Sequence, residues 1–325
     1  MTGATILGCA GPVLSRDEAA FFRQADPWGF ILFRRNVLDA AQLRALTGAL
    51  RDAVGRDAPV FMDQEGGTVQ RLRPPLARDW PDACAQRGDA AAIRLRHRLM
   101  AAELRAVGVD GNCAPVIDVA GPDTHPFLRR RVWSDDPADV AAKARAAAEG
   151  LLAGGVLPVL KHLPGHGAAN ADSHLTLPRC TQPLDALVAR DFAPVRALAD
   201  LPLGMTGHMV IEALDPETPA TLSPVVLRYL RETLGFGGLL MTDDLSMNAL
   251  PGTLPDRAAR AIAAGCDLVL HCSGDLAEME GVVAASGALG APWRAETALA
   301  ARRVPAPIDI AAATAELDRL SNPQV

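Results

Sequence analysis

Short apolar runs alternate with amphipathic segments along the whole chain. Eight of these runs have the length of strands, and most of them lack a polar face, which is typical of parallel strands buried on both sides. The predicted strands are Ala4–Cys9, Gly29–Phe33, Val60–Met62, Asn112–Ile117, Leu157–Leu160, Gly204–Met209, Leu239–Met241 and Asp267–His271.

The segments between these runs carry the start and stop signals of helices. A cap residue followed by proline marks a helix start, and glycine marks its end. The clearest boundaries are a leucine-spaced segment over residues 43–50 that Gly55 stops, a helix from Asp136-Pro137 to Gly154-Gly155, and a helix from Ser223-Pro224 to Gly235.

Polar residues fall at the carboxyl ends of six predicted strands: Asp63, Asp118, Lys161-His162, His208, Asp243-Asp244 and His271. A closed (β/α)₈ barrel gathers all strand ends around one mouth, whereas an open doubly wound sheet uses only the crevice at its switch point. No glycine-rich nucleotide motif follows the first strand. We therefore predict an α/β fold, a single-domain TIM-like barrel over residues 1–325, with the active site at the C-terminal strand ends. Residues from about 291 to 325 are expected to form a helical extension.

The composition argues against several classes of protein. The 325 residues are 49% hydrophobic and 22% charged, with a net charge of −6. Without a long basic run, nucleic acid is not an expected partner. The six cysteines form no C-x-x-C pair, which is typical of reduced core residues. The chain has no signal-peptide pattern and no apolar stretch near the roughly 18 residues of a membrane span, so we expect a cytoplasmic protein without a membrane partner.

The segment from Lys161 to His174 concentrates reactive side chains after an apolar run. It contains three of the seven histidines. In Asp172-Ser-His174, the carboxylate can accept one imidazole N–H, which fixes the tautomer and leaves the other nitrogen free for proton transfer. A chance contact in a surface loop is the alternative interpretation.

Three further groups could contribute to a site. Asp243-Asp244 ends a buried strand, where one carboxylate can act as a nucleophile while the other caps the next helix; the sequence alone does not separate them. Asp63 and Arg71 suit bidentate hydrogen bonding to hydroxyl groups, with an ordinary salt bridge as the alternative. Lys161 and His162 can bind substrate oxygens.

Other basic residues are expected outside the chemistry. The run 129–131 is typical of a solvated arginine cluster, and His97, between two arginines on a predicted helix, is expected to face solvent. His208 and His271 are expected to pack at the barrel mouth or behind the site.

Alternative functions remain open from the residues alone. His162, His166 and His174 with an aspartate could form a metal-dependent hydrolase, although Ala4–Cys9 lacks the H-x-H pair with which barrel metallohydrolases usually begin. Lys161 could form the Schiff base of an aldolase. A non-catalytic sugar-binding barrel is the third alternative.

Together, these motifs resemble those of the bacterial β-N-acetylglucosaminidases of glycoside hydrolase family 3. The resemblance covers about residues 33–272 in consistent order. It is carried by K-H-L-P-G-H-G at 161–167, D-S-H at 172–174, T-D-D-L-S-M at 242–247 and D-Q-E-G-G-x-V-Q-R at 63–71.

The resemblance implies a retaining exo-β-N-acetylglucosaminidase that acts through a covalent glycosyl-enzyme intermediate. Asp243 would be the nucleophile, His174 the acid and base, and Asp172 the partner of His174. A histidine departs from the usual carboxylate pair, but imidazole titrates near pH 6.5 without a shifted pKa. The implied sugar-binding residues are Asp63, Arg71, Arg131 (with Arg130 as a rival), Lys161 and His162.

The resemblance also implies the substrate. The expected partner is a small carbohydrate, an N-acetylglucosamine-anhydro-N-acetylmuramyl peptide of peptidoglycan recycling, with no cofactor and no metal. We expect a monomer. Since a neutral histidine repels an anion less than a carboxylate does, a phosphorylase that uses phosphate in place of water is an alternative. Thr68, Leu163, Thr242 and Gly207 differ from the common family pattern, which affects substrate preference rather than reaction class.

Overall fold

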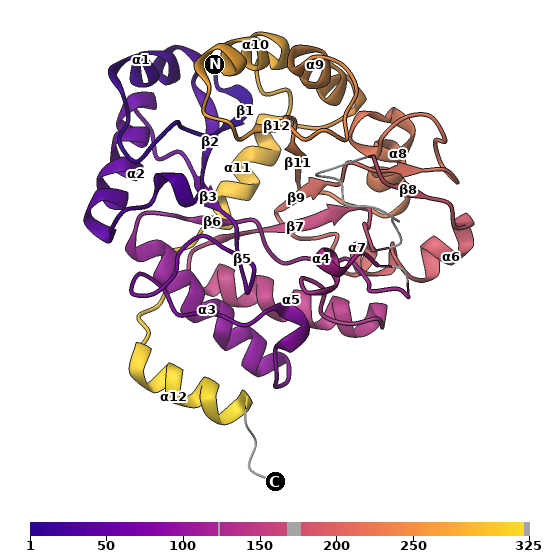
Figure 1. Ribbon diagram of the computed structural model, residues 1–325, viewed down its shortest axis with the longest axis horizontal. Coiled ribbons are helices and arrows are strands. Elements are labelled where there is room, and N and C mark those ends of the chain that lie inside the picture. Colours follow the sequence, from indigo (N-terminus) through magenta and orange to yellow (C-terminus); the bar gives the residue numbers. More distant parts are fainter. Residues whose placement is uncertain (123, 168–176, 322–325) are drawn as a thin grey trace.

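The computed structural model describes residues 1–122, 124–167 and 177–321, which are built around a closed barrel of eight parallel strands. The strands follow one another around the barrel in chain order (Figure 1). They are β1 (Gly3–Leu7), β2 (Pro27–Leu32), β3 (Val60–Met62), β6 (Gly111–Asn112), β7 (Leu157–Leu163), β9 (Leu203–Thr206), β11 (Leu239–Asp244) and β12 (Leu268–His271). The predicted barrel is confirmed, and each predicted strand overlaps one of these eight.

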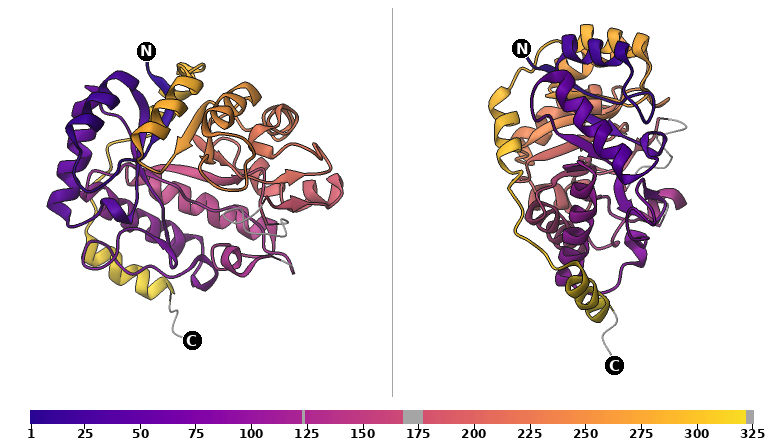
Figure 2. Two further views of the ribbon diagram at one scale, coloured as in Figure 1. Left: turned by 45° about the horizontal axis from the view of Figure 1, so that its top comes forward. Right: turned by 90° about the vertical axis from the view of Figure 1, so that its left-hand side faces the viewer.

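Helices cover the outside of the barrel (Figures 1 and 2). The α-helices are α1 (Arg16–Ala25), α2 (Ala40–Val54), α3 (Ala90–Ala106), α4 (Pro126–Arg129), α5 (Pro137–Ala153), α6 (Leu184–Ala189), α7 (Ala193–Ala197), α8 (Pro224–Arg228), α9 (Leu254–Ala264), α10 (Leu276–Ser286), α11 (Pro292–Ala300) and α12 (Ile310–Ser321). Shorter elements are the 3₁₀ turns η1 (Arg34–Asn36), η2 (Ala83–Ala85) and η3 (Ala220–Leu222), the π turn η4 (Tyr229–Thr233), and strands β4 (Gln64–Gly66), β5 (Val69–Gln70), β8 (Arg179–Cys180) and β10 (Val210–Ile211). Within the described ranges, no helix is long and apolar enough to cross a membrane.

The predicted helix boundaries are confirmed. Asp136 caps α5 by accepting the backbone N–H of Ala138, and proline occupies the first turn. Gly55 ends α2 with φ 65°, a left-handed conformation that glycine adopts at low cost. The helix that Ser223 caps changes into the π turn η4 before it ends near Gly235.

Strand β6 is shorter than its prediction, Asn112–Ile117. The Asn112 side chain accepts the backbone N–H of Gln64 (3.0 Å) and donates to its carbonyl (2.9 Å). Pro115 has no N–H for a ladder. On the β7 side, backbone hydrogen bonds continue beyond β6, from the Val159 N–H to the Ala114 carbonyl (2.9 Å) and from the Lys161 N–H to the Pro115 carbonyl (3.1 Å). Side-chain hydrogen bonds of Asn112 therefore replace part of the ladder on the β3 side alone.

Helix α11 closes the N-terminal end of the barrel. Its Ala295 and Ala298 belong to the same apolar cluster as inward-facing residues from early positions of the strands, such as Leu157, Leu239 and Leu268. Helix α12 packs against α3 with Leu317 buried (Figure 2). Residues 292–321 thus contain two helices packed on the barrel.

A buried carboxylate ties this end of the chain to the barrel. Asp110 is 1% exposed and accepts the backbone N–H of Val60 at 2.8 Å. Arg51 (3.1 Å), Arg105 (3.4 Å) and Arg302 donate to its other oxygen. Because three arginines surround one buried carboxylate, its charge is compensated.

The prediction that His97 faces solvent is wrong. His97 is 1% exposed on α3, where α5 packs closely enough that a Cβ on Gly150 would lie 3.0 Å from the His97 Cβ. Its Nδ1–H donates to the Ile93 carbonyl at 2.8 Å. Burial, assisted by the neighbouring Arg96, lowers the pKa of His97 to about 3. The arginines beside it suggested a solvated face, but α5 covers that face.

We expect His97 to make folding dependent on pH. Its folded pKa of about 3 lies below the value of 6.5 for an ordinary histidine, so the unfolded chain takes up the proton first as the pH falls. The stabilisation is complete above pH 6.5 and is lost toward pH 3, by about 1.4 kcal/mol per pH unit.

Urea unfolding of the protein and of His97→Asn between pH 7 and pH 5 measures this contribution. Asparagine keeps a donor for the Ile93 carbonyl but does not titrate. The stability difference between the two proteins should shrink by about 2 kcal/mol over this range. A difference that stays constant with pH would contradict the prediction.

Candidate active site

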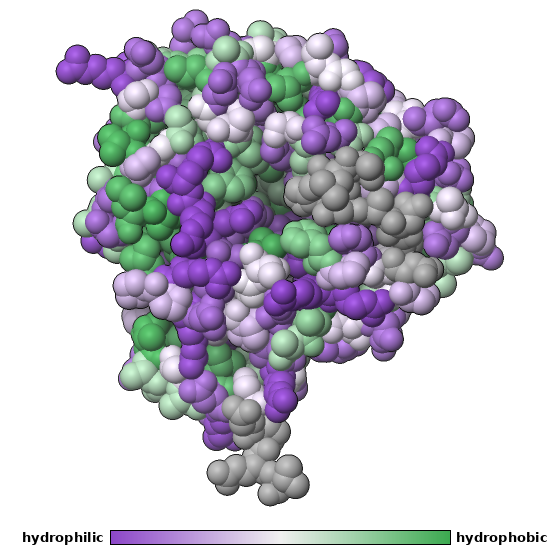
Figure 3. Space-filling model, in the orientation of Figure 1, coloured by the Kyte–Doolittle hydropathy of each residue, from purple (hydrophilic) through white to green (hydrophobic). Residues whose placement is uncertain are grey.

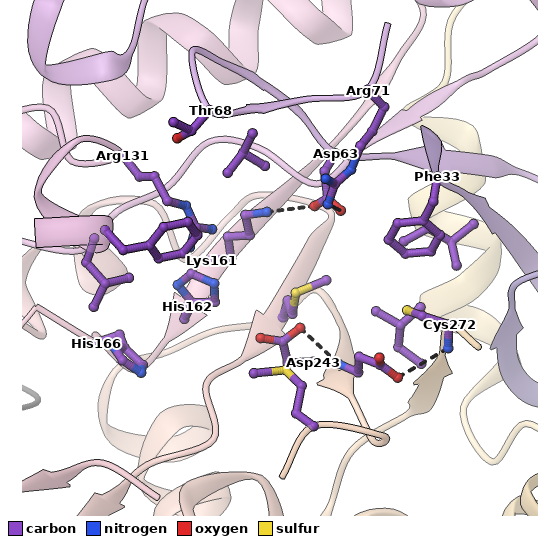
Figure 4. Close-up of a pocket in the computed structure, with 18 residues that line it drawn as sticks. Phe33, Asp63, Thr68, Arg71, Arg131, Lys161, His162, His166, Asp243 and Cys272 are labelled. Carbon is purple, nitrogen blue, oxygen red and sulfur yellow. Dashed lines mark hydrogen bonds and ion pairs between the residues drawn. The ribbon is translucent and has the colours of Figure 1, made fainter. Parts of the chain in front are cut away.

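A cavity of about 280 Å³ lies at the carboxyl ends of the barrel strands. Figure 3 shows it as a hollow bordered by hydrophilic side chains, and Figure 4 shows its interior. Its size is near the lower limit of about 300 Å³ for small-molecule clefts. One wall carries Asp63, Arg71, Arg131, Lys161 and His162, Asp243 lies across from them, and the apolar lining includes Ile31, Phe33, Met205 and Leu270.

Arg71 reaches the cavity because a tight hairpin, β4 to β5, reverses the chain after Asp63. Gly67 lies in this turn with φ 57°, and a Cβ there would come 1.7 Å from an Asp82 carboxylate oxygen. The side-chain oxygen of Gln64 accepts the backbone N–H of Arg71 at 2.9 Å. The two-glycine spacing in the sequence is therefore required by the turn and by the close approach of Asp82.

Three cations and two carboxylates form the polar wall. The Lys161 ammonium lies 2.9 Å from Asp63 and 2.7 Å from Glu65. Arg71 donates to the other Asp63 oxygen at 3.0 Å. Arg131 donates two hydrogen bonds to the Glu65 carboxylate, at 2.8 and 2.9 Å. This is the bidentate geometry that gives strong pairing.

This pairing decides which groups carry charge. Burial by itself would raise the pKa of Asp63, but Lys161 and Arg71 hold it well below the ordinary value. Burial likewise opposes the Glu65 charge, and Arg131 and Lys161 lower the pKa of Glu65. Burial would lower the pKa of Lys161, but the two carboxylates raise it. Lys161 is thus a charged donor at neutral pH, whereas a Schiff-base lysine needs a free amine.

The structure separates Arg131 from its two neighbours. Arg131 is 8% exposed and lines the cavity. Arg130 is 57% exposed at its side chain and pairs with Asp82. The expectation of a solvated cluster is thus wrong for Arg131, because its side chain is buried in an ion pair with Glu65.

His162 and His166 share one buried aspartate. Asp118 accepts the His162 Nδ1–H at 2.7 Å with one oxygen and the backbone N–H of His166 at 2.8 Å with the other. Burial lowers the pKa of His166 to about 4, against the opposing effect of Asp118. Among the described residues, both ring nitrogens of His166 lack a hydrogen-bond partner. His166 is therefore neutral at physiological pH.

Asp243 and Asp244 have different surroundings. The Asp244 carboxylate accepts the backbone N–H groups of Ser246 (3.1 Å) and Cys272 (3.2 Å), so it organises the loop after β11. Asp243 accepts the Asp244 N–H at 2.8 Å and lies against the cavity (Figure 4). Burial would raise the pKa of Asp243, but His208, His162 and this N–H lower it, so the carboxylate is ionised.

His208 and His271 are fully buried behind the cavity wall. His208 bonds to Thr221 through Nδ1 (2.8 Å) and to the Asp244 carbonyl through Nε2 (3.0 Å). His271 bonds to Ser273 through Nε2 at 2.9 Å. The positions agree with the expected packing behind the site.

Two predicted residues, Asp172 and His174, lie outside the described residues. Two residues that contact the predicted site residues, Glu65 and Asp118, have no role assigned from the sequence. Glu65 lies two residues after Asp63 in the motif D-Q-E-G-G, and this spacing is the signal that the sequence offers for it. Asp118 was noted as a strand-end carboxylate, but its partner His162 lies 44 residues away. Within the described ranges, no three His, Cys, Asp or Glu side chains group closely enough to hold a metal ion.

The comparison with protein families agrees with this arrangement. The profile of the glycosyl hydrolase family 3 N terminal domain matches residues 14–304. The chain therefore belongs to glycosyl hydrolase family 3, and within it to the β-N-acetylhexosaminidases.

Similar proteins support this placement. A beta-hexosaminidase of Methylococcus capsulatus is 40% identical over 273 residues, 81% of this chain and 80% of the relative. The structure of NagZ from Neisseria gonorrhoeae in complex with N-trifluoroacetyl-D-glucosamine superposes with a TM-score of 0.80, at 28% identity and 98% coverage of both chains. A family 3 β-N-acetylglucosaminidase from Paenibacillus sp. str. FPU-7 gives 0.86 at 26% identity, over 98% of this chain and 67% of that one.

We expect Glu65→Gln to weaken the polar wall. A glutamine oxygen at the Oε1 position can still accept from Arg131 and Lys161, but its NH₂ group then faces the Arg131 Nε–H and the negative charge between the two buried cations is lost. This should lower the free energy of unfolding by about 3 kcal/mol. Urea unfolding at pH 7 measures the loss. The matched control is Glu212→Gln, which affects the exposed pair with Arg179 and should change stability by less than about 1 kcal/mol. Equal effects of the two variants would contradict the prediction.

Proposed function

We propose that this protein is a retaining exo-β-N-acetylglucosaminidase that releases terminal, non-reducing N-acetylglucosamine from peptidoglycan fragments. The observation that carries the proposal is a one-sugar cavity with the ionised Asp243 facing a wall of hydroxyl-binding groups. Asp63 and Lys161 form a paired, largely buried wall on one side of the cavity, which favours binding of a terminal sugar and hence exo-cleavage. The amino-sugar ligand of the Neisseria NagZ structure supports the same choice of sugar.

In the proposed first step, an Asp243 oxygen attacks the anomeric carbon while the bond to the leaving oxygen breaks. His174 donates the proton that this oxygen takes up. In the second step, water attacks the same carbon, His174 accepts the water proton, and the bond to Asp243 breaks. Two inversions leave the β configuration unchanged. The Asp244 N–H that Asp243 accepts favours the ionised form of Asp243 for the attack.

The polar wall is proposed to bind the sugar hydroxyls. Asp63 has the acceptor oxygens, and Arg71, Arg131 and Lys161 have the donors. Since these groups are already paired with one another or with Glu65, they are preorganised and need little rearrangement when the sugar enters. We also propose that muropeptides are the natural substrates and that water, rather than phosphate, is the acceptor.

We expect Asp243→Ala to lower kcat for p-nitrophenyl N-acetyl-β-glucosaminide on the order of 10⁴-fold, because no other described carboxylate faces the same part of the cavity unpaired. A 5-fluoro glycosyl donor should label the native enzyme on Asp243, which peptide mapping identifies. A label on Asp244 would reverse the assignment of the two aspartates. Residual activity near that of the native enzyme would end the proposal.

We expect His174→Ala to affect glycosides according to their leaving groups. Loss of acid assistance should reduce kcat/KM for an N-acetylglucosaminyl disaccharide far more than for an aryl glycoside with an acidic phenol, because only the poor leaving group needs the proton. Steady-state kinetics on both substrates gives the ratio. An equal loss of kcat/KM on both substrates would assign the proton transfer to another group.

A separate measurement addresses the metal-dependent alternative. Full activity of the native enzyme after exhaustive chelation would exclude it.

A further inference from the structure

Asp118 is the most completely buried carboxylate near the cavity and has no place among the proposed catalytic or sugar-binding residues. It is 0% exposed and lies after β6. The neighbouring strand in the barrel, β7, carries His162. Among the described residues, one of its oxygens (Oδ2) has a single hydrogen-bond partner, Nδ1 of His162, at 2.7 Å. Its other oxygen (Oδ1) accepts two backbone N–H groups, from His166 at 2.8 Å and His162 at 3.3 Å.

These contacts give the two oxygens different tasks. Oδ1 faces backbone donors that cannot change, so this position must be filled by an acceptor. Oδ2 faces a ring nitrogen that can be either a donor or an acceptor, depending on where the imidazole carries its proton. An ionised carboxylate has acceptors at both positions. It therefore requires the proton of a neutral His162 to lie on Nδ1.

The consequence reaches the cavity through the other ring nitrogen. His162 lines the cavity beside Lys161 (Figure 4), and with Nδ1 occupied, Nε2 is the nitrogen left for a ligand. In the required tautomer, Nε2 presents a lone pair. The neighbouring Lys161, Arg71 and Arg131 are all donors, so an acceptor at Nε2 lets one sugar hydroxyl donate there while its oxygen accepts from a cation.

We propose that Asp118 is a positioning residue that determines the hydrogen-bonding polarity of His162, making its cavity nitrogen an acceptor for a substrate hydroxyl. This inference rests on the proposed function, because it takes His162 to contact the sugar. Asp118 does not itself touch the substrate; it acts through the ring.

Asp118→Asn tests the proposal with almost no change of shape. The amide oxygen must take the Oδ1 position, since the two backbone N–H groups require an acceptor there. The amide NH₂ then faces His162 Nδ1 and can only donate. A neutral His162 must move its proton to Nε2, so the cavity nitrogen changes from acceptor to donor.

The direct readout is ¹⁵N–¹H NMR of histidine side chains at pH 8, with the His162 signals identified by their loss in His162→Gln. We expect the Nδ1–H tautomer in the native protein and the Nε2–H tautomer in Asp118→Asn. The kcat/KM for p-nitrophenyl N-acetyl-β-glucosaminide should fall roughly 10- to 100-fold, the cost of one mismatched hydrogen bond to a polar ligand. The double variant Asp118→Asn/His162→Gln should be no slower than His162→Gln alone.

Asp215→Asn is the matched control. Asp215 also accepts two backbone N–H groups, from Glu217 and Thr218, and a side-chain donor, Ser223, but no histidine of the described part of the chain bonds to it. It should leave both the His162 tautomer and kcat/KM unchanged.

Three results would overturn the proposal: an Nε2–H tautomer in the native protein, an unchanged tautomer in a folded Asp118→Asn, or an inverted tautomer with native kinetics. The first needs only the His162→Gln variant that identifies the signals, so it stands even if Asp118→Asn does not fold. The proposed function fails separately, if the native protein does not cleave the glycoside, because the tautomer is read without turnover.

Discussion

The mutual pairing of buried charges is the constraint on which this site depends. Five ionic side chains at one end of the barrel lie within hydrogen-bond reach of an opposite charge. Each would be costly to bury alone. Lys161 joins the two carboxylates, Arg71 approaches from the hairpin after β3, and Arg131 comes from the segment after α4. The charges can therefore remain ionised and fixed in direction before any ligand arrives.

The same logic extends to the groups behind the wall. Glu65 pairs with two cations that line the cavity, Arg131 and Lys161. Asp118 bonds to the His162 ring and to the backbone N–H of His166. His208 bonds to the Asp244 carbonyl, next to the N–H that Asp243 accepts. The cavity is thus surrounded by a second layer of hydrogen bonds that orients the first. Sites of this kind are preorganised, which is what stabilisation of a charged transition state requires.

Barrel closure explains why residues far apart in the sequence meet. Asp63, Lys161 and Asp243 each end a different parallel strand, and closure brings these ends to one rim. The opposite end is covered by α11 and contains the Asp110 cluster, so it contributes stability rather than a cavity. This division lets the site residues be polar while most of the barrel interior is apolar.

The apolar runs determined the eight strands, and caps such as Asp136 and stops such as Gly55 determined helix ends, because these signals act over a few residues. The motifs also contained five of the polar residues that line the cavity, Asp63, Arg71, Lys161, His162 and Asp243. Tertiary structure alone decided that His97 is buried and that Arg131 rather than Arg130 turns inward. It also decided that Asp244, which lines the cavity beside Asp243, is bonded to the backbone N–H groups of Ser246 and Cys272, and that Glu65 and Asp118 orient their partners. Each of these depends on contacts between segments distant in the chain, and local patterns of polarity carry no information about such contacts.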